Sequence, residues 1–435
     1  MPHPITWLIV ALCLIVYVSA SAGIPAESAT DTVRIDSPIS SPYYPVTVPG
    51  KMLPMLRGLP TARITLFAIH SSVAVLIPFQ IDQRESNGQY RIDPALDDER
   101  PDREFTTADE LVFMAADIGT TASAAATTWH LRTIAALTVG DGEARGTVYI
   151  AVTDDGPAPR SAIDYVHYDA SNDSISTTTY RIHFHADQPF LVSGLQWRRS
   201  DGYGPNLIDT MKIRHRGKLF GKFDFLRTQA DYRSTLTAVK DGPIRIIRRT
   251  TNRVRVLWAL RSPGVDIDYI AYANHIVMDT TLDFPFRIGW FFKDVTTFAS
   301  MDLAGTPGMH VYNADGSDWL NMDGRMSAAK QHYNESRHKN FIMSDQDGMI
   351  VGTMHLTDRL PIVWHVLLVD DVTQPDPPES ITGQFGNIGF FTSRWEMMDT
   401  DVHHLYYSFY LIPPAPVEQA RELLAGAPHY GQDRR

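Results

Sequence analysis

Cysteine is almost absent from this chain of 435 residues, which has only Cys13. One cysteine cannot form an intramolecular disulfide or a site built from several thiolates, so stability must come from the burial of apolar side chains. The chain also lacks a nucleophile elbow, a P-loop, a dinucleotide fingerprint, a zincin helix and a haem attachment motif. No motif therefore assigns it to the enzyme classes that these motifs mark.

Long apolar runs are scarce as well. The run at residues 5–18 is shorter than the roughly 20 residues that a membrane-spanning helix needs, and Ser19, Ala20, Ser21 and Ala22 follow it. Small residues after a short apolar run predict a signal peptide, residues 1–22, cleaved after Ala22 and directing the protein to the periplasm or the outside of the cell. A retained anchor is the alternative, because the positive segment that normally precedes the apolar run is missing.

Helical periodicity is also weak, and short β-branched and aromatic runs divided by Gly, Pro, Asn and Asp predominate. This pattern predicts a mainly β protein of antiparallel β-sandwich architecture, in two layers or two β domains. The predicted strands lie at 62–70, 73–82, 111–115, 147–152, 163–168, 174–185, 234–239, 244–260, 266–277, 284–292, 349–355, 362–369, 388–391 and 404–411.

The domain organisation follows from length and composition. We expect a linker at 23–45, an N-terminal β domain with an acidic loop at 46–190, and a C-terminal β-sandwich with a basic stripe at 191–415. The segment 416–435 is expected to be a short helix and a tail, because Pro416 suits a first turn and Gly426 suits a helix stop. The late residues Trp290, Trp319, Trp364, Trp395, Met397 and Met398 are expected in the core.

Charge is distributed unevenly. Residues 208–261 hold fourteen basic and four acidic residues, a local charge of +10, whereas the whole chain carries −11 and the remainder therefore −21. Residues 82–117 hold eleven acidic and four basic residues, a net −7. A concentrated positive field attracts anions. Nucleic acid is a poor match, because the rest of the chain is acidic and carries no recognition motif.

The basic segment contains a candidate anion site. Arg253 and Arg255 alternate with two valines, so a strand places both guanidinium groups on one face. A hairpin of 245–249 and 253–256, turning at 250–252, would align Arg245 and Arg248 with them in one stripe, and guanidinium groups suit carboxylate, sulfate or phosphate. Nearby aromatic residues that could stack on a ligand are Tyr203, Phe220, Phe223, Phe225, Tyr232 and Trp258.

Three hypotheses follow for this segment. The first is a non-enzymatic binding or assembly module for an anionic ligand or protein partner. The second is a polysaccharide lyase, in which Arg253 or Arg255 neutralises a uronate carboxylate and Tyr269, Tyr272 or His275 removes the α-proton. The third is a salt-bridged surface matched by the acidic loop.

Two groups of residues suggest a metal ion, and no other cofactor is expected. Asp82, Asp109 and Glu110 in the acidic segment offer the oxygen ligands that calcium prefers, and a solvated loop is the alternative. His183 and His185 flank one residue of a predicted strand, so they share a face and could reach one ion, although a polar sheet face has the same pattern.

Two pairs of segments resemble a known group of proteins. They are PFQID at 78–82 with ADELVFMAADIG at 108–119, and IGFFTSRWEMM at 388–398 with YYSFYLIP at 406–413. They are similar to secreted bacterial β-sandwich proteins of uncharacterised function, some of which border on mutarotase-like, carbohydrate-associated folds. The resemblance covers a minor part of the chain and implies a sandwich and an extracytoplasmic location. It carries over no catalytic residue.

Overall fold

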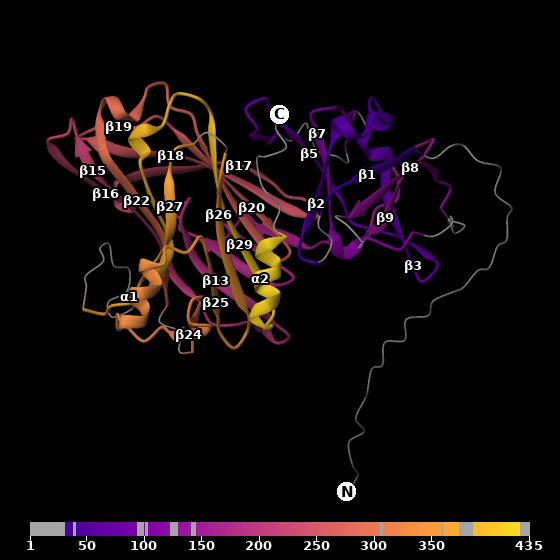
Figure 1. The fold of residues 1–435 in the computed structure, drawn as a ribbon. Helices are drawn as coiled ribbons and strands as arrows, with labels where there is room; N and C mark the ends of the chain where they lie inside the picture. The colour runs from indigo at the N-terminus through magenta and orange to yellow at the C-terminus, as the bar shows by residue number, and fades with distance from the viewer. Residues whose placement is uncertain are drawn as a thin grey trace, which may run out of the picture.

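The computed structural model describes residues 31–37, 41–93, 100, 103–121, 129–140, 145–304, 308–357, 360–373 and 386–426. The predicted signal peptide and C-terminal tail lie outside these residues. The described chain forms several antiparallel sheets in a smaller N-terminal body and a larger body beside it (Figure 1). The predicted mainly β sandwich is therefore confirmed. No helix of this part is long and apolar enough to cross a membrane.

A ten-stranded sheet forms the centre of the molecule. Its strands β21 and β29 are buried along nearly their whole length, because other sheets cover both faces. In spatial order the strands are β17 (Tyr232–Lys240), β18 (Arg245–Leu257), β20 (Val265–Tyr272), β21 (His275–Leu282), β29 (His403–Ile412), β26 (Met349–Leu356), β25 (Asn340–Ser344), β23 (His310–Asn313) and β24 (Asp318–Asn321), with β19 (Leu260–Arg261) paired to β18.

Two five-stranded sheets cover one face of the central sheet. Buried side chains of all three sheets form one apolar core, in which Ile246, Leu195 and Ile388 take part. The first sheet has the order β16 (Phe223–Thr228), β15 (Ile208–Leu219), β22 (Phe292–Leu303), β28 (Asn387–Ser393) and β27 (Val363–Val369). The second has the order β10 (Val166–Asp169), β11 (Ser174–Thr177), β12 (Tyr180–Phe184), β13 (Val192–Arg199) and β14 (Gly202–Tyr203).

The N-terminal body covers the opposite face of the central sheet. Its core is continuous with Val351 and Ile412 of the central sheet and with Leu423 of helix α2. One sheet has the order β1 (Asp31–Ile35), β8 (Arg132–Gly140), β9 (Arg145–Val152), β3 (Ile64–His70) and β4 (Val73–Leu76). The other has the order β2 (Pro45–Pro49), β7 (Asp109–Met114), β5 (Gln80–Arg84) and β6 (Tyr90–Arg91).

Several boundaries differ from the sequence predictions. β1 lies within the expected linker and pairs in parallel with β8. The boundary expected after residue 190 falls between β12 and β13, which pair with each other in one sheet. The expected strand at 284–292 is an irregular connection with a short 3-10 helix, η7 (Ile288–Trp290). Pro285 has no backbone N–H to donate to a neighbouring strand, which explains the interruption.

Two α-helices accompany the sheets. The predicted C-terminal helix is confirmed as α2 (Val417–Ala425), with Pro416 and Gly426 at its ends. The other helix, α1 (Ala328–Glu335), is not predicted from the sequence. It buries only Lys330 and Tyr333, so it leaves almost no apolar periodicity in the sequence.

A buried ionic network joins the central sheet to the N-terminal body. Arg245 of β18 is fully buried, and its Nε donates to Asp82 Oδ2 of β5 over 2.9 Å and its Nη1 to Tyr272 Oη over 2.8 Å. Arg245 also pairs with Glu110 of β7. Lys240 of β17 contacts the other oxygen of Asp82 at 2.8 Å. Each charge is therefore paired with charges from another sheet, as buried ions must be.

The network keeps both carboxylates ionised. Burial by itself raises the pKa of Asp82, but Lys240 and Arg245 hold that pKa well below its ordinary value. Burial likewise opposes ionisation of Glu110, whose pKa Arg84 and Arg245 lower to about 2. The cations are thus required for the stable burial of the carboxylates.

Replacing Arg245 with alanine leaves Asp82 and Glu110 buried with fewer cations, so we expect the free energy of unfolding to fall by about 3–5 kcal/mol. The control Arg253→Ala removes an exposed guanidinium group from the same strand and should change stability by no more than about 0.5 kcal/mol. Urea unfolding followed by circular dichroism measures both. Equal, small effects of the two substitutions would contradict a structural role for the network.

Candidate functional site

The predicted arginine stripe does not form. Residues 250–252, expected to be a turn, lie inside β18, which runs without a break from Arg245 to Leu257. In one strand, residues an odd number apart point to opposite faces. Arg248 therefore points away from the face that carries Arg245, Arg253 and Arg255.

Burial divides these arginines further. Arg248 is fully buried, pairs with Asp173 and donates from Nη1 to the Pro189 carbonyl over 2.7 Å. Arg245 belongs to the buried network. Arg253 and Arg255 are exposed, on the face opposite Val254 and Val256 as the alternation predicts, and Arg255 pairs with Asp231. Only Arg253 and Arg255 of the four are thus open to an external anion.

The residues of the lyase hypothesis are not brought together. Tyr269, Tyr272 and His275 are fully buried. Tyr269 Oη donates to the Phe190 carbonyl over 2.6 Å, and the His275 ring stacks on Tyr410 with 4.0 Å between ring centroids. β18 pairs Arg245 with Tyr272 and Arg248 with Tyr269, so the exposed arginines lie further along the strand. These residues do not face one another across a sugar-binding cleft.

The predicted metal ligands have other partners. Asp82 and Glu110 belong to the buried network, and Asp109 accepts a hydrogen bond of 2.7 Å from Arg103. His185 lies beyond the end of β12 and is hydrogen-bonded to Thr210 Oγ1 at 2.9 Å, and a register shift separates it from His183. No group of three or more potential ligands occurs within the described ranges.

An apolar cavity of about 470 Å³ lies between the central sheet and the β16–β15–β22–β28–β27 sheet. Its volume falls within the roughly 300–1,000 Å³ of typical small-molecule sites. The cavity lies at the end of β18 that is remote from Arg245, where Asn252, Val254 and Val256 face inward. A β-bulge near Gly217 bends β15 at this end.

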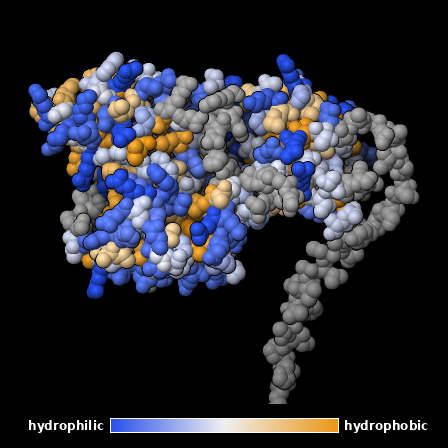
Figure 2. Space-filling model, viewed as in Figure 1, coloured by the Kyte–Doolittle hydropathy of each residue, from blue (hydrophilic) through white to orange (hydrophobic). Residues whose placement is uncertain are grey.

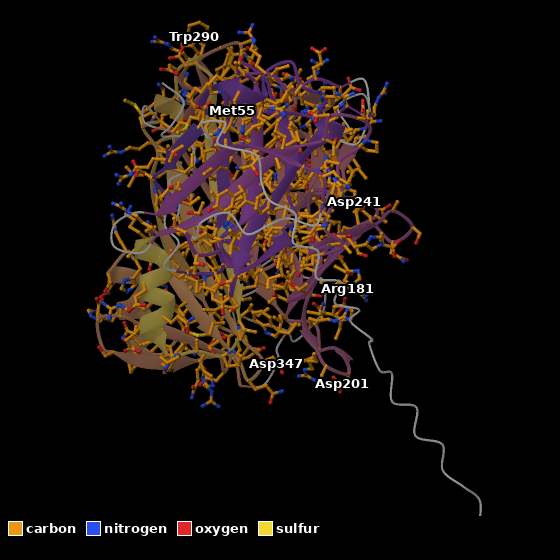
Figure 3. All side chains as sticks on the ribbon, turned by 90° about the vertical axis from the view of Figure 1, so that its right-hand side faces the viewer. Met55, Arg181, Asp201, Asp241, Trp290 and Asp347 are labelled. Atoms are coloured by element: carbon orange, nitrogen blue, oxygen red, sulfur yellow. The ribbon has the colours of Figure 1, made fainter. Side chains whose placement is uncertain are left out.

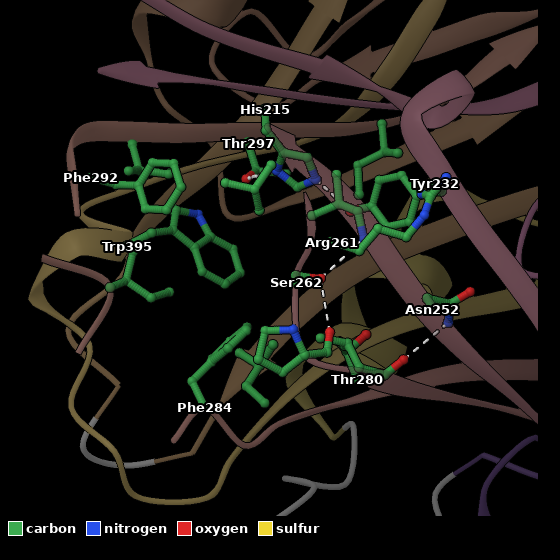
Figure 4. Close-up of a pocket in the computed structure, with 18 of the residues that line it drawn as sticks. His215, Tyr232, Asn252, Arg261, Ser262, Thr280, Phe284, Phe292, Thr297 and Trp395 are labelled. Atoms are coloured by element: carbon green, nitrogen blue, oxygen red, sulfur yellow. Dashed lines mark hydrogen bonds between the residues drawn. The ribbon is translucent and has the colours of Figure 1, made fainter. Parts of the chain in front are cut away.

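Strands and connections both contribute to the lining. β21 provides Met278, Thr280 and Leu282, and β22 provides Val295, Thr297 and Ala299. The connection between β21 and β22, which the proline keeps out of the sheet, provides four apolar side chains. They are Phe284, Phe286, Ile288 and Phe291. In Figure 4 the aromatic side chains of Phe284, Phe292 and Trp395 lie together at the left, and Tyr232 and Asn252 lie at the right.

One polar cluster within the lining is held by internal hydrogen bonds. His215 of β15 is hydrogen-bonded through Nδ1 to Thr297 Oγ1 at 2.8 Å and through Nε2 to Tyr232 Oη at 2.5 Å (Figure 4). Burial lowers the pKa of His215 to about 4. The ring is therefore neutral at physiological pH, with one nitrogen donating and the other accepting.

Asn252 offers a second polar group. Its side chain is buried, and its Nδ2 donates to Thr250 Oγ1 over 3.0 Å and to the Val265 carbonyl over 3.2 Å. Its Oδ1 has no hydrogen-bond partner within the described part of the chain. A buried acceptor without a partner is costly, so this atom lowers the stability of the fold beside the cavity.

The mouth of the cavity is marked by residues that both line it and are exposed. They are Phe220, Leu260, Arg261 and Phe291. Arg261 Nη1 donates to the Asp231 carbonyl over 3.1 Å, and no described carboxylate pairs with its guanidinium group. On the face shown in Figure 2, apolar patches interrupt the hydrophilic surface of the larger body. The mouth thus combines apolar side chains with a positive charge.

Sequence reasoning missed a strand that builds this site. β15 is not among the predicted strands, although Lys212, Arg214, Arg216 and Lys218 alternate there with Met211, Ile213 and His215. The alternation has the period of a strand and places the apolar side chains and His215 on the cavity face. Lys212 is buried against Asp302 at 2.7 Å, whereas Arg216 and Lys218 are exposed.

No family model matches, and no curated protein is significantly similar in sequence. Among solved structures, an alpha-mannosidase from Enterococcus faecalis V583 aligns with a TM-score of 0.44 and 9% identity over 91% of this chain and 46% of that chain. A protein in glycosyl hydrolase family 38 from Enterococcus faecalis aligns with a TM-score of 0.42 and 9% identity over 89% and 45%.

This chain therefore spans less than half the length of either neighbour. Likeness at these TM-scores carries no inference about what the protein binds.

The buried histidines predict an acid-sensitive fold. Burial lowers the pKa of His215 to about 4, and burial with a smaller effect of His355 lowers the pKa of His275 to about 3. The unfolded chain takes up these protons near pH 6.5, so stability is complete above about pH 6.5 and falls as pH drops from there towards 4. Over this window each histidine should cost about 3 kcal/mol, since one pKa unit corresponds to about 1.4 kcal/mol.

The substitution His215→Gln removes one of these protonation sites, so we expect its free energy of unfolding to depend less steeply on pH between about 4.5 and 6.5. His332→Gln, at an exposed position of α1, serves as the control and should keep the slope of the wild-type protein. Urea unfolding at a series of pH values provides the measurement. An unchanged slope in the His215 variant would show that this ring does not resist protonation.

Proposed function

We propose that this protein binds an amphipathic molecule, whose apolar part occupies the cavity and whose anionic group lies at the mouth. The observation that carries the proposal is the combination of a nearly all-apolar cavity of about 470 Å³ with the exposed guanidinium group of Arg261 at its opening. Burial of apolar ligand surface provides the affinity, and the charge-assisted hydrogen bond orients the ligand.

The composition of the lining favours this ligand class over a sugar. A saccharide buried here would lose the hydration of its hydroxyl groups and would find few partners, because the lining offers mainly Asn252, Thr280 and the already bonded His215 cluster. Unpaired polar groups are costly to bury. An alkyl or acyl chain has no hydroxyl groups that need hydrogen-bond partners inside the cavity. A carboxylate or a phosphate at its end suits Arg261 equally well.

The proposal makes the protein a binding module and assigns it no reaction. The hypothesis of an anionic ligand becomes narrower, since the anionic group is expected at Arg261 at the cavity mouth and not at the buried Arg245 and Arg248. We further propose that the protein acts in the periplasm or outside the cell, as the apolar leader at 5–18 predicts.

Calorimetric titration with dodecanoate, dodecyl phosphate and the uncharged dodecanol tests the ligand class. We expect both anions to bind. The substitution Arg261→Gln should lower their affinity by roughly tenfold, because one charge-assisted hydrogen bond contributes on the order of 1.5 kcal/mol. The affinity for dodecanol should change little. Arg421→Gln, on the exposed face of α2, is the matched control. A higher affinity for one of the two anions would identify a fatty acid or a phosphorylated lipid as the preferred source of the head group.

A second substitution tests the cavity itself. Ala299→Phe places a ring in the cavity and should reduce the affinity for all three ligands by at least about tenfold, as apolar contacts are lost. Thr296→Phe puts the same ring on the opposite face of β22 and should leave binding unchanged. Failure of every dodecyl compound to bind the wild-type protein would overturn the proposed function.

A further inference from the structure

Exposed aromatic side chains gather around the cavity mouth. Trp258 is 90% exposed, Trp290 68% and Phe223 64%. Of the six exposed Phe and Trp side chains in the described ranges, five lie at residues 216–228, 253–264 and 283–294, and the sixth is Trp319. We call these three segments the rim. Large exposed apolar patches mark sites of interaction with proteins, membranes or ligands.

Two of these aromatic residues occupy strained positions. Phe220 has φ 52° in the turn between β15 and β16, and Trp258 has φ 40° in the turn between β18 and β19. Positive φ in tight turns is normally taken by Gly, Asn or Asp, and a bulky side chain there is disfavoured. Neither ring gains burial in return, since both are exposed. Both apolar rings are thus exposed at the tips of turns, and the strained backbone there lowers the stability of the fold.

The rim is one connected surface. The Phe220 N–H donates to the Phe291 carbonyl over 2.6 Å, which joins the first and third segments. Arg227 donates to the Arg255 and Val256 carbonyls over 2.6 Å, which joins the first and second segments. The exposed rings are therefore held in a fixed arrangement at one end of the molecule. In Figure 3, Trp290 projects at the end opposite Asp201 and Asp347.

The rim is also strongly basic. It holds nine basic and three acidic residues, a charge of +6, whereas the remainder of the chain carries −11 − 6 = −17. Arg216, Lys222 and Arg253 are exposed and form no ion pair with any described residue. Aromatic rings interleaved with Lys and Arg suit the interface of an anionic bilayer, where rings enter the headgroup region and cations meet lipid phosphates.

We propose that the rim docks on the surface of an anionic phospholipid bilayer, with Trp258, Trp290 and Phe223 inserted among the headgroups. The inference rests on the proposed function, because docking in this orientation places the cavity mouth against the bilayer. An amphipathic ligand then passes between membrane and cavity without exposing its apolar part to water. The strongly negative remainder of the chain is repelled by the same surface, which fixes the orientation.

Vesicle sedimentation with the full chain tests the docking. We expect binding to phosphatidylglycerol vesicles at least about tenfold tighter than to phosphatidylcholine vesicles, and weaker binding at high salt, because several rim cations lie near the surface. Tryptophan fluorescence should shift to the blue on binding. Equal binding to the two lipids, or none to either, would refute the proposal.

The double substitution Trp258→Asn, Trp290→Ser removes two inserted rings and should lower vesicle binding by at least about tenfold. Asn suits positive φ, so the variant is expected to keep the melting temperature of the wild-type protein. Trp319→Ser, at the exposed tryptophan outside the rim, is the control and should bind vesicles normally. A double variant that is folded and binds vesicles as tightly as the wild-type protein would contradict insertion of these rings.

Two comparisons separate this inference from the proposed function. The rim double variant should keep wild-type affinity for dissolved dodecanoate, because Trp258 and Trp290 do not line the cavity. Ala299→Phe should lose dodecanoate binding and keep vesicle binding. If the rim instead mediates self-association, the mass of the wild-type protein in solution will rise with concentration, and the double variant will stay monomeric. The wild-type protein will then not bind vesicles. This outcome would overturn membrane docking without contradicting the proposed ligand site.

Discussion

The burial of Arg245 is the constraint on which the architecture depends. A guanidinium group removed from water needs carboxylates in fixed positions, and Asp82 and Glu110 come from strands of the N-terminal body. The contact holds that body on one face of the central sheet, so β21 and β29 are covered on both sides. The buried cations of the basic segment are in this way neutralised inside the molecule and do not contribute to its surface charge.

The opposite end of β18 has a different role. Beyond Thr250 the strand turns Asn252, Val254 and Val256 inward, and the facing sheet is bent by the bulge in β15, so the two sheets enclose a space that their own side chains do not fill. The connection after β21 adds apolar side chains without sealing the mouth. An unfilled apolar cavity lowers the stability of the fold, and the strained backbone at the two exposed rings of the rim lowers it further. Costs of this kind at one end of a protein point to binding.

Some parts of the fold and site could be predicted from local pattern alone. The alternation at Arg253 and Arg255 placed two valines inside and two arginines outside, and Pro416 with Gly426 delimited the last helix. Of the six aromatic residues expected near the basic segment, Phe220, Phe225 and Tyr232 line the cavity, whereas Tyr203 lies in β14 against Arg181 and Arg198. The predicted turn at 250–252 and the core placement of Trp290, Trp319 and Met397 were wrong. Polar residues at 250–252 can form a turn or continue a strand, and only their neighbours decide between the two.

The sequence by itself determined the mainly β character of the chain and the unequal distribution of charge, because strand period and net charge are local or additive properties. The tertiary structure decided which cations are buried and which are exposed. Arg245 and Arg253 have the same chemistry and lie on the same face of one strand. They differ because the N-terminal body covers one and not the other, and that contact joins residues more than a hundred positions apart. The cavity arises from the same long-range packing, since its walls come from strands that are distant in sequence.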